Sequence, residues 1–359
     1  MEKIACLISF LISSAGYVIN LSIPLYLISK FSASPFILGI AGFFGNFAYT
    51  TFTYIFHKFR WRLHFPWFII SSLFISLNYF FLPFCPHYKY MFILFFINGI
   101  FYSRFWPSIQ YIFSQNSIHI DRYNISWSSG VIFGIFISGY LFKVKDTLPF
   151  WMGCFFAFIG FLSGFINFKK FKLFYRDLPE KFYERKPLDK ETKKVMLLNF
   201  SSFFAIGGFL FVFPKLANNI GYSSNLISNI ITFLFLIRTS MFYVFSKIKI
   251  RTTDKILFFN YLFICLSLIG AGISKNFPLH LIFISLLGFC SAYSYRLGLF
   301  TVIEKGFSTE LNESIIGIGL FTGPLIVGIL SQIFGIFNGF IFSGVLILII
   351  FLFQKYLIK

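Results

Sequence analysis

The chain has 359 residues, of which 57% are hydrophobic and only 12% are charged, whereas about 25% are charged in a soluble domain. The formal net charge is +19, but the basic residues are spread over the segments between apolar runs, which argues against a nucleic-acid partner and for contact with membrane lipid. These values exclude a water-soluble protein and predict an all-α protein that spans a membrane.

Twelve apolar runs follow one another along the chain, each long enough to cross a hydrocarbon core about 30 Å thick. Proline occurs within or at the ends of four of them, at Pro24, Pro107, Pro214 and Pro324, where we expect local bends rather than breaks. The first run is too long for a secretory signal and is expected to stay as a span. The predicted spans are 4–29, 36–57, 66–85, 90–113, 125–142, 147–168, 195–217, 226–246, 255–274, 278–303, 313–333 and 336–356.

The distribution of lysine and arginine predicts the orientation. Ten basic residues lie between 169 and 194, and the other loops on that side are also basic. The loops on the opposite side hold six lysines: Lys30, Lys89, Lys143, Lys145, Lys215 and Lys275. By the positive-inside rule, both termini are expected in the cytoplasm, with the protein in the cell membrane.

A repeat at an offset of 189 residues predicts two similar halves. The motif Tyr54-x-Phe56-x-Lys58-x-Arg60-x-Arg62 returns as Tyr243-x-Phe245-x-Lys247-x-Lys249-x-Arg251. The same offset carries Gly99, Gly130, Gly134 and Gly139 onto Gly288, Gly319, Gly323 and Gly328. Each half has an even number of spans, so the halves are expected to be related by an axis along the membrane normal. The predicted domains are residues 1–168, a cytoplasmic linker at 169–194, and residues 195–359.

With this six-plus-six pattern and its repeated basic loop, the chain resembles the major facilitator superfamily over nearly its whole length. Further similarities are Phe105-Trp106-Pro107-Ser108, Asn124-Ile125-Ser126-Trp127 and Gly319-x-x-x-Gly323-Pro324-x-x-x-Gly328. The resemblance implies a transporter that works by alternating access, with spans 1, 4, 7 and 10 around a central cavity. The family's G-x-x-x-D-R-x-G-R-R motif falls on residues 53–62, but its Gly, Asp and second Gly are here Thr53, His57 and Arg60.

Three arginines within spans are the main candidates for substrate binding, because a charge there costs about 2.5 to 3.5 kcal/mol. They are Arg104, Arg238 and Arg296. The repeat places Arg104 and Arg296 on one face of equivalent helices, and the resemblance would turn that face towards the cavity. A guanidinium holds carboxylates and phosphates through two parallel hydrogen bonds. The alternatives are that Arg238 extends to the inner surface and that Arg296 pairs with Glu304 or Glu313.

Aromatic side chains near these arginines could complete a binding wall, since they combine apolar rings with polar atoms. The candidates are Trp106, Tyr293 and Tyr295, with Tyr102 nearby.

Groups that could couple or gate transport are few, because the spans contain almost no carboxylates. Glu304 and Glu313 are the acidic candidates. The basic stretches are either gate residues or topology signals bound to anionic lipid; they contain Lys58, Arg60, Arg62, Lys247, Lys249 and Arg251. Close helix packing is expected at Gly130, Gly134, Gly139, Gly319, Gly323, Pro324 and Gly328.

The sequence thus predicts a transporter of a small organic anion, with an exporter of hydrophobic or amphipathic compounds as the alternative. An enzyme would need a cluster of acid, base or nucleophilic side chains, and the sequence offers no motif of that kind. A transporter-like sensor is the other alternative, and it would be recognised because it binds a ligand without transporting it. The five cysteines form no C-x-x-C pair, so we expect neither a metal site nor a cofactor. The expected partners are a small-molecule substrate and lipid, and the expected functional unit is a monomer.

Overall fold

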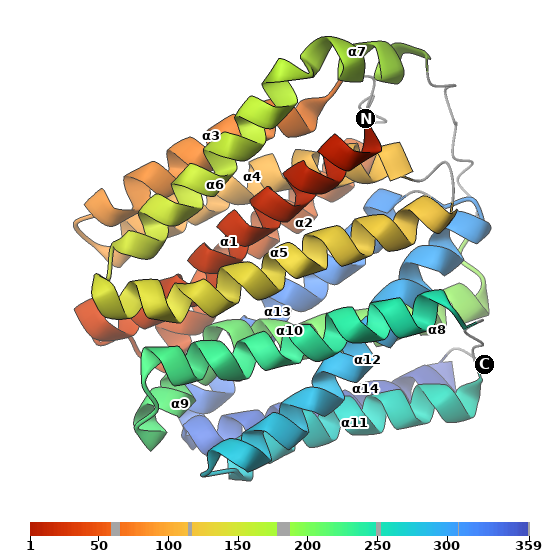
Figure 1. Cartoon of the computed structure of the whole chain (residues 1–359). Helices are drawn as coiled ribbons and strands as arrows, with labels where there is room; N and C mark the ends of the chain where they lie inside the picture. Colours follow the sequence, from red (N-terminus) through yellow and green to blue (C-terminus); the bar gives the residue numbers. More distant parts are fainter. Residues whose placement is uncertain (59–64, 114–116, 178–186, 249–252, 308, 358–359) are drawn as a thin grey trace.

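The computed structural model describes residues 1–58, 65–113, 117–177, 187–248, 253–307 and 309–357, and these residues form helices joined by short connections (Figure 1). The first six helices in the bundle are α1 (Glu2–Phe31), α2 (Pro35–Lys58), α3 (Trp67–Phe81), α4 (Tyr88–Phe113), α5 (Ser117–Val144) and α6 (Leu148–Ile166), with a 3₁₀ turn, η1 (Leu82–Phe84), after α3. A short helix, α7 (Phe168–Asp177), follows them. The remaining helices are α8 (Lys190–Phe211), α9 (Phe213–Ile220), α10 (Ser224–Ser246), α11 (Asp254–Ile273), α12 (Phe277–Glu304), α13 (Thr309–Phe334) and α14 (Ile336–Leu357).

The all-α prediction and its twelve spans are confirmed: within the described residues, twelve helices are long and apolar enough to cross a membrane. The largest differences from the predicted bounds are in the fifth and seventh spans. Helix α5 begins at Ser117 rather than 125, because the polar residues that precede the apolar run continue the helix. The seventh span is interrupted at Val212, between α8 and α9, where Pro214 enters the first turn of α9. Proline lacks the N–H that a continuous helix needs there.

The helices form two groups that lie side by side (Figure 1). Helices α1 to α6 pack mainly on one another, as do α8 to α14, and the two groups meet most extensively where α2 packs on α13 and α5 packs on α10. Both chain termini lie at the same end of the bundle, which is called the terminal end below. Buried apolar residues of both groups belong to one continuous hydrophobic cluster, which extends across the surface where the groups meet.

Contacts between the groups repeat with the offset found in the sequence. A Cβ on Gly139 of α5 would lie 2.5 Å from the carbonyl oxygen of Ser224 on α10. A Cβ on Gly328 of α13 would lie 2.7 Å from the carbonyl oxygen of Pro35 on α2. Because Pro35 and Ser224 are also 189 residues apart, the two interfaces use equivalent positions, and glycine is required at both because the backbones approach so closely.

The other glycines of the predicted packing set lie inside a group rather than between groups. Gly130 and Gly134 of α5 contact α1, and Gly319 and Gly323 of α13 contact α8. Pro324 packs against Gly39 and Gly42 of α2 and Gly207 of α8. Of this set, Gly139, Gly328 and Pro324 therefore lie at the surface where the two groups meet.

The segment between the groups contributes one amphipathic helix, α7. Its Phe171 ring lies 5.0 Å from Phe68 of α3, and the hydroxyl of Tyr175 donates to the carbonyl oxygen of Ser108 on α4. Phe171 and Tyr175 are fully buried, while three lysines face outwards: Lys169, Lys170 and Lys172. One face of α7 therefore packs on α3 and α4, and its lysines point away from them.

Asp189 begins the second group as the N-cap of α8. Its carboxylate accepts from the N–H of Thr192 at 2.7 Å and from the ammonium of Lys305 at 2.9 Å. The hydrogen bond from the Thr192 N–H has the largest effect and the bond from Lys305 the next, and together they lower the pKa of Asp189 to about 2. The cap therefore stays ionised at physiological pH and ties the start of α8 to the end of α12.

Candidate functional site

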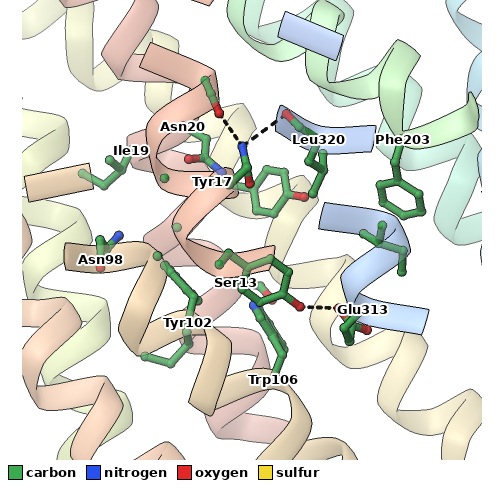
Figure 2. Close-up of a pocket in the computed structure, with 18 of the residues that line it drawn as sticks. Ser13, Tyr17, Ile19, Asn20, Asn98, Tyr102, Trp106, Phe203, Glu313 and Leu320 are labelled. Carbon is green, nitrogen blue, oxygen red and sulfur yellow. Dashed lines mark hydrogen bonds between the residues drawn. The ribbon is translucent and has the colours of Figure 1, made fainter. Parts of the chain in front are cut away.

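A cavity of about 160 Å³ lies between the two groups of helices (Figure 2). Most of its wall comes from α1, α2 and α4 of the first group, and α5, α8, α12 and α13 complete it. Figure 2 shows Tyr102 and Trp106 on one side of the cavity and Glu313 and Leu320 on another. The polar and aromatic lining residues are Ser13, Tyr17, Asn20, Asn46, Tyr49, Phe95, Asn98, Tyr102, Trp106, Gln110, Tyr123, Trp127, Phe203, Phe211, Tyr295 and Glu313.

Helical spacing explains which residues of α4 reach the cavity. Phe95, Asn98, Tyr102, Trp106 and Gln110 are three or four residues apart and all line it. Residues at these intervals share one face of a helix. A similar stripe runs along α1 through Ser13, Tyr17 and Asn20.

Among the described residues, Glu313 is the one acidic residue in the cavity wall. Its side chain is almost completely buried, and its two carboxylate oxygens accept hydrogen bonds from helices of the other group. The hydroxyl of Tyr49 on α2 donates to Oε2, and the side-chain amide of Gln110 on α4 donates to Oε1 at 2.7 Å. Glu313 therefore joins α13 to both α2 and α4, so any motion that separates these helices must break the two bonds.

Replacing Tyr49 with phenylalanine should lower the apparent unfolding temperature in detergent by several degrees. The ring would still fill its place, but a buried carboxylate would lose one of two donors, at a cost of about 1 to 3 kcal/mol. Tyr54→Phe is the matched control on the same helix, because Tyr54 is 52% exposed. Equal effects of the two substitutions would contradict the importance of the Tyr49–Glu313 bond.

Arg238 of α10 lies directly behind the cavity wall. Its side chain is fully buried, and its Nε and both terminal nitrogens lack a hydrogen-bond partner among the described residues. Five aromatic rings surround the guanidinium, with centroids between 4.9 and 5.7 Å from Cζ. They belong to Trp127, Phe203, Phe235, Phe242 and Tyr295.

This burial rules out, for this structure, the alternative that Arg238 extends to the membrane surface. Three of the five rings, those of Trp127, Phe203 and Tyr295, also line the cavity. The rings attract the guanidinium through their faces, by about 2 kcal/mol or more for a desolvated contact. No atom of these residues, nor of any other described residue, accepts a hydrogen bond from the guanidinium, so the donors of Arg238 remain unsatisfied.

Arg104 and Arg296 do not line this cavity, contrary to the expectation that both face it. Arg104 lies two residues from Tyr102 and two from Trp106, which is more than half a turn away from their shared face. Its guanidinium stacks on Phe56 of α2, with 3.4 Å between Cζ and the ring centroid.

Arg296 is held at the terminal end. Its Nε lies 3.4 Å from Oδ1 of Asp121 on α5, and its Cζ lies 4.7 Å from the ring centroid of Phe300. The expected partners, Glu304 and Glu313, are not the ones found. Because Asp121 and Arg296 belong to different groups, this ion pair links the groups where the chain ends lie.

The predicted aromatic residues divide in the same way. Trp106 and Tyr295 line the cavity, whereas Tyr293 packs with Phe245, the ring centroids being 6.0 Å apart. The repeat explains this placement, since Tyr293 and Phe245 are the equivalents of Arg104 and Phe56. The first pair joins α4 to α2, and the second joins the equivalent helices of the other group, α12 and α10.

The remaining candidates for coupling or gating lie away from the cavity. Glu304 ends α12 and is exposed. Lys58 is exposed at the end of α2, and Lys247 donates to the hydroxyl of Tyr243 at 2.7 Å. Four other basic candidates, Arg60, Arg62, Lys249 and Arg251, lie outside the described residues.

Several lining residues were not singled out from the sequence. Tyr17, Asn20, Asn98, Gln110 and Trp127 all reach the cavity. The signal was present for α1 and α4, where polar side chains recur every three or four residues in otherwise apolar helices. In a chain with 59 phenylalanines and 19 tyrosines, aromatic residues alone gave no such signal.

The chain matches no protein-family model, and no curated protein sequence matches it. Solved structures do match along the whole chain. The crystal structure of nucleoside transporter NupG has a TM-score of 0.72 at 12% identity, with 100% of this chain and 99% of that chain covered. The human organic anion transporter MFSD10 has a TM-score of 0.71 at 14% identity, with 98% of each chain covered.

A bacterial homologue of the human lysosomal transporter Spinster, in an inward-facing and occupied conformation, has a TM-score of 0.72 at 13% identity, covering 99% of this chain and 95% of that chain. The fold is that of the major facilitator superfamily. At these identities the likeness establishes the architecture alone, and the matched structures named here are transporters rather than enzymes. In a major facilitator fold, a cavity between the two helix groups is the place where a substrate would bind.

Proposed function

We propose that the protein is a transmembrane transporter that works by alternating access. Support comes from the major facilitator fold and from a cavity bounded by both groups of helices. Contacts between the groups lie on both sides of the cavity along the bundle: Asp121 with Arg296 at the terminal end, and Gly328 with Pro35 towards the other. Residues 1–168 and 195–359 would move as two halves, joined by the linker at 169–194.

The substrate proposed is a small organic acid that binds through its anionic group, and the observation that carries this proposal is Arg238. Burying an unpaired charge costs several kcal/mol, so such a residue is expected to have a partner in some state of the protein. Among the described residues Arg238 has none within hydrogen-bond distance. A carboxylate or phosphate from the cavity would satisfy its donors.

Access to Arg238 follows from where its aromatic neighbours lie. Trp127 belongs to α5 of the first group, whereas the other four rings belong to α8, α10 and α12 of the second. Separation of α5 from α10 would therefore remove the Trp127 indole from the guanidinium and leave the other rings in place. In this proposal, rocking of the halves alternately covers Arg238 and opens it to the cavity.

Uptake into vesicles by the purified protein tests the proposal. The compounds are radiolabelled organic acids with and without an amino group, with benzoate, phenylpropionate and phenylalanine as the first set. At least one acid should enter faster than into protein-free vesicles, and unlabelled acid should compete. If no acid enters while a labelled amphipathic amine does, the anion assignment is wrong.

The second candidate is an exporter of hydrophobic or amphipathic compounds. It is favoured by one observation: the cavity wall is rich in aromatic side chains and contains the Glu313 carboxylate, whereas Arg238 lies behind the rings. An amphipathic amine would pair with Glu313 in such a site. The vesicle experiment separates the two candidates.

We also place the protein in the cell membrane with both termini in the cytoplasm, on the distribution of basic residues. A monomer is sufficient for the proposed mechanism, because one chain supplies both helix groups and the whole cavity. Reaction of a maleimide with cysteines introduced at each terminus, in intact cells, would test the orientation.

A further inference from the structure

The charges around the cavity specify the substrate more closely than the anionic group alone. We infer that the substrate is a zwitterion, an organic acid that also carries a protonated amino group, with its acid directed to Arg238 and its ammonium to Glu313. This inference rests on the proposed function. It adds a second charged group on the substrate and a second binding residue.

The first step concerns the charge on Glu313. Both carboxylate oxygens accept hydrogen bonds, from the Tyr49 hydroxyl and from the Gln110 amide. Burial disfavours the ionised form of a carboxyl group, and hydrogen bonds donated to both of its oxygens oppose that effect. With Glu313 ionised in this arrangement, the cavity wall carries a negative charge.

The second step concerns the charge balance. The positive charge of Arg238 and the negative charge of Glu313 interact, and Tyr17 and Tyr295 lie within electrostatic range of both. No salt bridge joins the two, because the nitrogens of Arg238 have no hydrogen-bond partner in the described part of the chain. Before substrate binds, these two side chains are together neutral.

A plain anion would bring an uncompensated negative charge into this enclosed site. An uncompensated charge in such surroundings costs several kcal/mol. A zwitterion adds no net charge, and it satisfies the unpaired donors of Arg238 while placing a cation beside Glu313. The pair of fixed charges thus favours amino acids and similar compounds over simple carboxylates or simple amines.

The third step concerns the body of the substrate. Near Arg238 the cavity wall contains three aromatic rings: Trp106 and Trp127 lie 6.4 Å apart, and Trp127 and Tyr295 lie 5.4 Å apart, measured between ring centroids. Rings at these positions suit a flat apolar group. An aromatic amino acid is therefore a fitting first probe.

Three matched compounds test the inference on the full-length protein in detergent. Phenylalanine carries both charges, phenylpropionate lacks the amino group and phenylethylamine lacks the acid. Ligands that bind the folded state raise its apparent unfolding temperature. Phenylalanine should raise it most, with a dissociation constant lower than that of phenylpropionate by on the order of tenfold.

Glu313→Gln should reverse this order, because the amide keeps the shape but removes the negative charge. Phenylpropionate should then bind at least as tightly as phenylalanine. Glu304→Gln is the matched control, since Glu304 is exposed at the end of α12, and it should leave the order unchanged. If Glu313→Gln does not fold, the order of the three compounds on the wild type still decides.

Each other outcome has a definite meaning. If phenylpropionate stabilises the wild type as well as phenylalanine does, the zwitterion inference is overturned and the organic-acid proposal stands. If only phenylethylamine stabilises it, both are overturned in favour of amphipathic amines. If neither phenylalanine nor aminomethylbenzoate, whose charges are farther apart, gives a shift, the zwitterion inference is wrong.

Discussion

Replacing Arg238 with methionine is expected to abolish uptake of organic acids while leaving the protein at least as stable as the wild type. The loss should be about 30-fold or more, because removing one partner of a buried charged contact costs about 2 kcal/mol or more of binding. Stability should not fall, since the charge removed has no hydrogen-bond partner within the described ranges and methionine packs well against aromatic rings. Vesicle uptake and the unfolding temperature in detergent give the two readings.

Arg104→Met is the matched control on an equivalent depth of α4. Arg104 stacks on Phe56 and does not line the cavity, so uptake per folded molecule should stay within about twofold of wild type. Loss of uptake in Arg104→Met, together with normal uptake in Arg238→Met, would contradict the assignment of the anion site to Arg238.

Replacing Gly328 with valine is expected to slow transport without unfolding the protein. The new Cβ would lie 2.7 Å from the Pro35 carbonyl oxygen and 3.0 Å from the Cα of Gly39. These are backbone atoms of α2, so the contact is relieved only if the two groups move apart at this end. Overpacking costs about 1 to 3 kcal/mol. If this cost applies only to the state in which α2 and α13 are in contact at Gly328, that state becomes about 5- to 150-fold less populated.

Gly160→Val is the corresponding control inside one group. A Cβ there would meet the Ile12 side chain of α1 at 3.1 Å, and that side chain can adjust. Uptake should therefore change much less than in Gly328→Val, at similar amounts of folded protein. Similar rates for the two variants would show that close approach at Gly328 is not needed for transport.

The sequence alone predicted most of the fold. Length and hydropathy determine the number of spans, because each crossing of a hydrocarbon core needs about 20 apolar residues whatever its neighbours are. The repeat predicted more: residues 189 apart make equivalent contacts, as Gly139 with Ser224 and Gly328 with Pro35 show. Only helix ends and the interruption at Val212 differed, since these depend on local backbone hydrogen bonds.

The site was predicted only in part, and the arginines show why. All three carry the same intrinsic cost of a charge within a span. The repeat favoured Arg104 and Arg296 over Arg238, but neither Arg104 nor Arg296 lines the cavity. The candidates Trp106 and Tyr295 line the cavity, and so does Trp127, whose motif was noted but which was not named as a candidate.

The number of spans and the repeat were thus determined by the sequence itself, because they depend on composition and periodicity along one chain. Only the tertiary structure decided which charge faces which partner. Arg104 stacks on Phe56, Arg296 pairs with Asp121, and Arg238 is left beside the cavity without a hydrogen bond. The physical reason is that each partner lies on another helix, so its position depends on the packing of helices distant in sequence.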